Sequence, residues 1–220
     1  MGPPPKKSRT GLIVTLSIVG FLILGAIGTI AVTAASRGEG PSDSYPEAKY
    51  RLTLPQGLLG GDYTLAKDLS GSARGDDGTF DRSDAKNWKG VAAMYSAKGG
   101  AQAGGLTVSG MYGQIRNPEG MRNGMMRGGG QGQNATVAVP AEEITPAGSD
   151  GLTVSCQVLT MDQGGNTTTV PMCAWADENT AAVVSEMTSA TVTKAPEDID
   201  LEQAAARALE VREQLRRPIG

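Results

Sequence analysis

The two cysteines of the chain are the residues with the clearest capacity for chemistry. Cys156 and Cys173 lie on either side of Gly164-Gly165 in the stretch VSCQVLTMDQGGNTTTVPMCAW. If the two glycines form a two-residue turn, a hairpin results in which the cysteines face each other. Counting outward from the turn makes them a pair without mutual backbone hydrogen bonds. The Cα atoms of such a pair approach to about 4.5 Å, which a disulfide accepts.

Metal binding, redox chemistry and a structural bond are the alternatives for these cysteines. A zinc-type site needs three or four ligands, and the chain contains no histidine to complete one. A redox pair is usually Cys-x-x-Cys at a helix start, which is not the spacing here. The pattern therefore favours a structural Cys156–Cys173 disulfide in an exported domain, with free thiols as the alternative.

The same register makes two predictions about neighbouring residues. Pro171 falls on a non-hydrogen-bonded site of the hairpin, so its missing N–H costs this pairing nothing. On its other side the proline would interrupt a ladder, so we expect the 169–176 arm to be a sheet edge or to be bulged there. Trp175 shares a strand face with Cys173 and is predicted to pack beside the disulfide in the core.

The other candidates for chemistry favour structural interpretations. Without histidine, Ser-His-Asp and Cys-His catalysis are excluded. Ser83 and Lys86 match a Ser-x-x-Lys spacing, but the partner motifs of that enzyme class are missing. Asp76, Asp77, Asp81 and Asp84 depart from the EF-hand pattern and predict a solvated loop.

Methionines and adjacent carboxylates complete this set. Met121, Met125 and Met126 are predicted to face a core from a short helix that begins at Pro118. Asp177 and Glu178 are neighbours, whose side chains on a strand would point to opposite faces, so a turn is favoured. We therefore predict no catalytic, cofactor-binding or metal-ligating residue.

The N-terminal region predicts a membrane span. Residues 11–34 contain no charge and are apolar on every face. As a helix they would extend ~36 Å, against a hydrocarbon core of ~30 Å. A cleavable signal peptide is the alternative, but its apolar core is normally ~7–15 residues long, and the length here favours a retained anchor.

Charge orients this span and limits the partners. Residues 1–10 hold three of the 20 basic residues and none of the 23 acidic ones, which predicts a cytoplasmic stub and an exported remainder. The exported part, from residue 37 onward, carries a net charge of −6. That balance disfavours nucleic acid and anionic lipid as partners and leaves the bilayer around residues 11–34, an extracytoplasmic protein or a small ligand.

The exported part predicts an α+β domain. Residues 35–48 are rich in Gly, Pro, Ser and charge and are expected to form a flexible linker, so the domain is assigned to residues 49–220. Strand patterns at 50–54, 105–115 and 136–140 join the cysteine hairpin. Asp200 and Gln203 predict the start of an amphipathic C-terminal helix that Pro218 stops. We expect an antiparallel sheet with this helix packed across it.

Several stretches of the sequence resemble a group of actinobacterial, Streptomyces-like membrane proteins with one span. They are YRLTLPQGLLGGDYTLAKDLSG, SGMYGQIRNPEG, LTVSCQVL, CAWADENTAAVV and ALEVREQLRRPIG, which together cover most of the chain from about residue 49. The resemblance implies a membrane anchor, an exported domain and a disulfide, and it supplies no catalytic residue.

Taken together, the sequence predicts a membrane-anchored, non-enzymatic binding or interaction module on the outer side of the membrane. Two alternatives stay open. One is an envelope component with a structural or stress-related role and no small ligand. The other is a hydrolase that uses carboxylates alone, which would need two acidic residues from different strands in one cleft.

Overall fold

The computed structural model describes residues 44–71, 84–99, 104–132, 134–163 and 166–220. The predicted stub, the predicted span at 11–34 and most of the predicted linker lie outside these ranges. Within them, no helix has the length and apolar character needed to span a bilayer.

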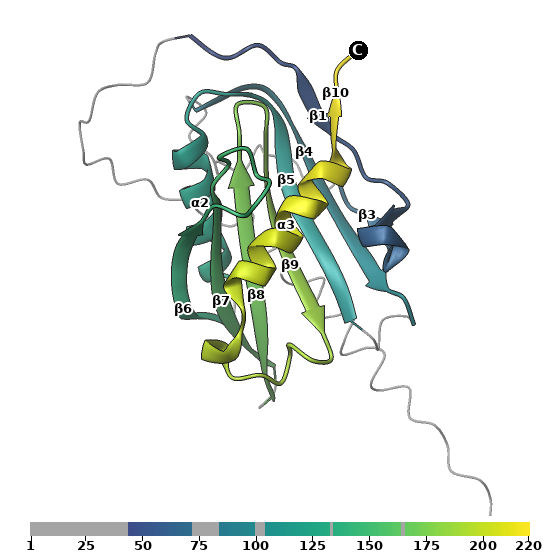
Figure 1. Cartoon of the computed structure of the whole chain (residues 1–220), viewed down its shortest axis with the longest axis vertical. Coiled ribbons are helices and arrows are strands. Elements are labelled where there is room, and N and C mark those ends of the chain that lie inside the picture. Colours follow the sequence, from purple (N-terminus) through teal and green to yellow (C-terminus); the bar gives the residue numbers. More distant parts are fainter. Residues whose placement is uncertain (1–43, 72–83, 100–103, 133, 164–165) are drawn as a thin grey trace, which may run out of the picture.

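An antiparallel sheet forms the centre of the described part of the chain (Figure 1). Eight described strands lie in the order β2-β3-β4-β5-β9-β8-β7-β6. Their bounds are β2 Gly57–Leu58, β3 Tyr63–Asp68, β4 Ala85–Ala97, β5 Gly104–Ile115, β6 Ala135–Ile144, β7 Val154–Gln163, β8 Asn166–Ala176 and β9 Thr180–Thr188. A short 3-10 helix, η1 (Leu59–Gly61), connects β2 to β3, and a second, η2 (Pro196–Asp198), precedes the last helix.

The cysteine hairpin has the predicted register. Gln163 pairs with Asn166 and Cys156 pairs with Cys173 along β7 and β8. The two cysteines form a disulfide, with their Cα atoms 4.1 Å apart. This distance is that of a non-hydrogen-bonded pair, so the disulfide predicted from the turn position is confirmed. Trp175 is fully buried in the same core cluster as both cysteines.

The expectation that the 169–176 arm is a sheet edge or bulged at Pro171 is wrong. β8 is an interior strand between β7 and β9. The missing N–H of Pro171 interrupts no ladder, because the pairing of β8 with β9 covers only Met172–Ala176. This pairing begins at the residue that follows the proline in the sequence. Beyond it, the Thr169 amide donates to the Val192 carbonyl in the segment that follows β9.

Helix α3 (Leu201–Leu215) crosses one face of the sheet diagonally (Figure 1). The Asp200 carboxylate accepts a hydrogen bond from the Gln203 amide at 2.9 Å, which confirms the predicted N-cap. The helix ends at Leu215 rather than at Pro218. Residues Arg216–Pro218 instead form strand β10, which pairs with β1 (Tyr50–Leu52) in a separate two-stranded sheet.

Helix α2 (Pro118–Gly130) packs against the strands on the opposite face, chiefly β8 and β9. The Asn117 side chain caps it by accepting from the Gly120 amide. The helix continues through Gly128–Gly130, although glycine disfavours a helix locally. At Gly129 a Cβ atom would lie only 2.3 Å from the Met172 side chain, so the absent side chain lets helix and sheet approach closely.

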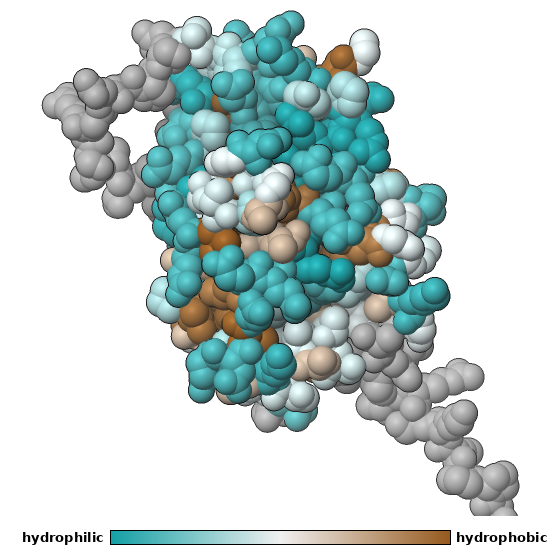
Figure 2. Space-filling view, in the orientation of Figure 1, coloured by the Kyte–Doolittle hydropathy of each residue, from teal (hydrophilic) through white to brown (hydrophobic). Residues whose placement is uncertain are grey.

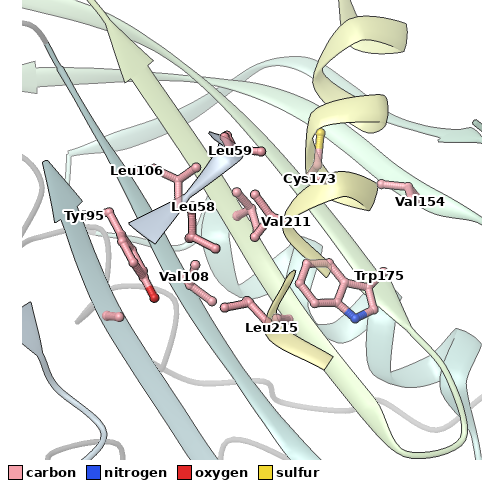
Figure 3. Close-up of a cluster of buried hydrophobic side chains, with 14 of the residues drawn as sticks. Leu58, Leu59, Tyr95, Leu106, Val108, Val154, Cys173, Trp175, Val211 and Leu215 are labelled. Atoms are coloured by element: carbon pink, nitrogen blue, oxygen red, sulfur yellow. The ribbon is translucent and has the colours of Figure 1, made fainter. Parts of the chain in front are cut away.

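Two apolar clusters hold these layers together. The cluster beneath α3 contains the disulfide, Trp175, Val211 and Leu215, and Figure 3 shows the last two pointing from the helix between Val108 and Trp175. The cluster beneath α2 contains the three methionines predicted to face a core, together with residues of β7, β8 and β9. The α+β class, the antiparallel sheet and the C-terminal helix packed on it are therefore confirmed.

Several strand boundaries differ from the sequence prediction. The segment 50–54 contributes β1 to the small sheet and not to the main one. The long strand β4 starts at Ala85, directly after Asp84, the last carboxylate of the predicted solvated loop. Strand β6 continues past Pro140 to Ile144 with two register shifts, which an edge strand tolerates.

Candidate functional site: a cavity beneath the C-terminal helix

A cavity of about 360 Å³ lies between α3, strands β5, β8 and β9, and the segment that joins β9 to α3. Its volume is within the range of small-molecule sites, which is about 300–1,000 Å³. The lining residues of the sheet are Leu106, Pro171, Cys173, Val184, Glu186 and Thr188, and those of α3 are Gln203, Ala204, Arg207, Ala208 and Val211. The connecting segment adds Ala190, Thr191, Lys194, Ile199 and Asp200.

The floor of the cavity is aliphatic, and the space above it exists because α3 carries small side chains there. Ala204 and Ala208 occupy one face of α3, a single turn apart, where larger side chains would fill the space above the sheet. Cys173, Val184 and Leu106 form the surface below them. The disulfide thereby fixes the strand that carries part of the floor. Figure 2 shows a mainly hydrophilic face whose apolar patches gather along α3 and the adjacent strands.

Glu186 and Arg207 form one polar wall of the cavity, and a hydrogen bond connects Glu186 to Tyr63, which does not line the cavity. Glu186 of β9 accepts from the Tyr63 hydroxyl at 2.6 Å and from Arg207 Nη2 at 2.7 Å. Arg207 Nε donates to the second carboxylate oxygen at 3.3 Å. The arginine therefore binds both oxygens in a forked geometry, and the carboxylate joins α3 to the first residue of β3.

The environment shifts the proton affinities of this group. Burial, and then the hydrogen bond and charge of Glu186, raise the pKa of Tyr63 well above its usual value. The hydrogen bond to Glu186 is also the main cause that raises the pKa of Arg207. Tyr63 therefore stays a neutral donor and Arg207 stays charged across the physiological range.

The remaining polar residues lie around the mouth of the cavity. Asp200 caps α3, and the hydroxyl groups of Thr188 and Thr191 lie 3.2 Å apart and bond each other. Lys194 is exposed, and within the described residues its ammonium group has no carboxylate partner. No aromatic ring is among the described lining residues. The cavity thus offers an aliphatic floor and a polar rim, without a surface on which rings stack.

Of the residues singled out from the sequence, Pro171, Cys173 and Asp200 line the cavity, whereas Asp177, Asp84 and Lys86 lie elsewhere. Asp177 lies in the turn between β8 and β9, as predicted, and binds Arg212 of α3 at 2.7 Å. Lys86 lies in strand β4, and Ser83 is outside the described ranges. Asp84 is 3.9 Å from Arg116, whereas Asp76, Asp77 and Asp81 also fall outside the described residues.

The sequence prediction missed Glu186 and Arg207, although a signal was present. Glu186 follows Val184 by two positions, so it points to the same, core-facing side of its strand. Arg207 lies one turn before Val211 on the buried stripe of α3. Each is therefore a charged residue on an apolar face, and two such residues of opposite sign predict a pair.

The fold and the cavity define a class: an α+β domain with a central antiparallel sheet, a helix on each face and a half-open site beneath the C-terminal helix. The chain matches no family model, no curated protein and no solved structure in the comparisons with known proteins.

Proposed function

We propose that the chain is a membrane-anchored, exported binding module that holds a small ligand with an aliphatic body in the cavity beneath α3. The carrying observation is the combination of an aliphatic floor with one polar wall made by Glu186 and Arg207. Apolar pockets with a few convergent polar groups are the usual form of small-molecule sites. The aliphatic part would cover the floor, and a polar end group would reach the wall or the rim.

Two features support an exported position. The disulfide is buried beneath α3, with Cys156 fully buried and Cys173 3% exposed, and such bonds form and persist in oxidising compartments. The apolar, uncharged segment at residues 11–34, with basic residues before it, is typical of a membrane anchor with a cytoplasmic N-terminus.

The partners of the carboxylates favour binding over hydrolysis. Glu186 is the acidic residue of the cavity wall, and both of its oxygens accept from Arg207. Asp200, the other carboxylate of the cavity, caps the helix. A general base must accept a proton from its substrate, but hydrogen bonds from Arg207 and Tyr63 already occupy both oxygens of Glu186.

The ligand class can be tested with water-soluble probes that share one aliphatic body. Heptanoate, hexylamine and 1-hexanol each carry a hexyl chain and differ in the chemistry and charge of the head group. The full chain would be placed in lipid nanodiscs, and the methyl NMR signals of Leu106, Val184 and Val211 would be followed during titration with each probe. We expect saturable shifts of these signals with at least one probe, and the preferred head group identifies the polar end.

Two alanines of α3 provide matched variants. Ala204 lines the cavity and Ala206 is exposed on the same helix. Leucine at either position keeps a high helix propensity. We expect Ala204→Leu to abolish the probe shifts and Ala206→Leu to preserve them. If no hexyl probe moves the three methyl signals of the folded protein, ligand binding in the cavity is refuted and the structural envelope role is favoured.

A further inference from the structure

The small sheet of β1 and β10 carries a basic surface at the end of the molecule where the described chain begins. We propose that this surface, defined by Arg51, Arg217 and the exposed Ile219, contacts the anionic phospholipid head groups of the membrane. The proposal rests on the anchoring proposed above, and it adds an orientation. The β1–β10 end would face the bilayer and the cavity beneath α3 would face away from it.

The segment that leads into β1 is hydrogen-bonded to the domain. Asn179 in the β8–β9 turn is only 4% exposed and binds the incoming segment from both sides. Its Oδ1 accepts from the Lys49 amide at 3.0 Å, and its Nδ2 donates to the Glu47 carbonyl at 2.8 Å. Gln114 donates to the Pro46 carbonyl at 2.8 Å. The last residues of the predicted linker are therefore bound to the domain.

Because this segment is bound to the domain, an N-terminal anchor would bring that end of the domain close to the membrane. Only residues 35–45 would separate a span that ends at residue 34 from Pro46, the first residue of the bound segment, and they reach at most ~40 Å when fully extended. The C-terminus lies at the same end of the molecule, beyond β10 (Figure 1). The start of the bound segment is thus held within that distance of the proposed membrane surface, and β1, with β10 paired to it, follows directly.

Two arginines of the small sheet face each other and could bind an anion. Arg51 lies directly opposite Arg217 in the β1–β10 register, and both side chains are exposed. Like charges in directly opposed positions repel each other unless an anion lies between or above them. Arg217 Nη1 donates to the carbonyls of Glu213 and Arg216, and among the described residues no carboxylate pairs with Arg51 or Arg217.

An apolar side chain accompanies these cations. Ile219 is 45% exposed, one of two large hydrophobic side chains with high exposure among the described residues. Its amide donates to the Lys49 carbonyl, which holds it beside Arg51. Figure 2 shows an apolar spot among hydrophilic neighbours at this end of the molecule. Basic residues with an adjacent exposed aliphatic side chain match a surface of phosphate groups above acyl chains.

The net charge of the exported part argues against lipid contact for the domain as a whole, but charge acts locally. Screening limits the attraction to about 8 Å at physiological ionic strength, so only groups close to the bilayer matter. The short segment between the proposed span and Pro46 places the β1–β10 end closest to the bilayer. Each basic residue near an anionic surface strengthens the contact roughly fivefold, which corresponds to ~1 kcal/mol.

The contact can be measured with a tryptophan reporter in the full chain. Ile219→Trp and Val137→Trp place the reporter at the two exposed apolar positions, one in the proposed contact and the other on β6 at the edge of the main sheet. Each variant would be reconstituted in vesicles with brominated acyl chains, either anionic or zwitterionic. We expect bromine quenching for Ile219→Trp in anionic vesicles, and none beyond the wild-type background for Val137→Trp.

Charge-reversal variants test whether Arg51 and Arg217 make the contact with anionic lipid. In the Ile219→Trp background, Arg51→Glu with Arg217→Glu should reduce quenching to the zwitterionic level, while Lys67→Glu, a reversal on β3, should leave it unchanged. Equal quenching in both vesicle types, or none, overturns the proposal. Binding of soluble polyglutamate by Arg51 and Arg217 without lipid quenching would assign the surface to an anionic polymer and also overturns it. If the wild-type chain fails to float with vesicles after alkaline extraction, anchoring itself has failed.

Discussion

The Asp177–Arg212 ion pair gives the sharpest prediction about stability. Asp177 accepts from the backbone amides of Asn179 and Thr180 at 2.9 and 2.7 Å and from the Thr180 hydroxyl at 2.8 Å. Arg212 of α3 pairs with it at 2.7 Å and Arg216 of β10 at 3.5 Å, and the Asp177 and Arg212 side chains are each less than one-fifth exposed. The carboxylate therefore fastens the C-terminal half of α3 to the β8–β9 turn.

Replacing Asp177 by asparagine keeps the shape but removes the charge that Arg212 needs. Removal of one partner of a buried pair typically costs 3–5 kcal/mol, because the other charge stays buried. Arg212 also binds Glu213, which lessens the loss, so we expect Asp177→Asn to lower the free energy of unfolding by about 3 kcal/mol. Glu213 is 61% exposed, and Glu213→Gln should cost under ~1 kcal/mol.

Urea unfolding followed by tryptophan fluorescence measures both variants, because Trp175 is buried in the core that α3 covers. In a double-mutant cycle, Asp177→Asn with Arg212→Met should show coupling of about 2 kcal/mol. Equal effects of Asp177→Asn and Glu213→Gln, or coupling near zero, would refute the idea that burial makes the first carboxylate dominant.

The same pair predicts an acid dependence. Burial alone would raise the pKa of Asp177, but hydrogen bonds from Arg212, Asn179 and Thr180 outweigh it, so the pKa is lowered. Because the folded-state pKa is below the unfolded-state value, the stabilisation is present above about pH 4 and is lost as the pH falls through the folded-state pKa. The wild type should therefore lose more stability than Asp177→Asn on acidification below pH 4, and unfolding curves that stay equally separated would contradict this.

Three further predictions concern the frame around the cavity. Replacing Cys156 and Cys173 by alanine should lower the free energy of unfolding by at most ~3 kcal/mol, the chain-entropy value for a separation of 17 residues, as measured by denaturant unfolding. Gly110→Ala should lower the free energy of unfolding by about 1–3 kcal/mol, because the added Cβ would lie 2.4 Å from a carbonyl oxygen of β9. Gly57→Ala is the control and should be nearly neutral in the same assay, because the nearest atom to its Cβ is 3.6 Å away. Asn179→Ala should release the incoming segment, seen as faster amide hydrogen exchange at Lys49, and unchanged exchange there would contradict the attachment.

Local signals account for the parts of the fold that the sequence predicted. The hairpin register followed from Gly164-Gly165 and the two cysteines, all within one short segment. Helix α3 followed from the Asp200 cap and its apolar spacing. In both cases the deciding contacts lie between residues close in sequence, where turn chemistry and periodicity are informative.

Long-range pairing accounts for what the sequence did not predict. The neighbours in β5 and β9 are far apart in the chain, and no local pattern indicates that Leu106 lies opposite Glu186. The triad of Tyr63, Glu186 and Arg207 depends on that placement. Helix α2 shows a related limit: glycines 128–130 disfavour a helix locally, but packing on Met172 outweighs their propensity.

The two ion pairs that connect α3 to strand β9 and to the β8–β9 turn divide the helix into halves with different roles. The C-terminal half buries Val211 and Leu215 and is fastened through Arg212 to the β8–β9 turn. The N-terminal half carries Ala204 above the cavity, and its charged link to the sheet is Arg207 with Glu186. On the proposed function, a ligand in the cavity would disturb the partly exposed Arg207–Glu186 pair, because Arg207 lines the cavity and Arg212 does not. The Asp177–Arg212 pair lies outside the cavity, so it would keep the C-terminal half of the helix attached to the β8–β9 turn.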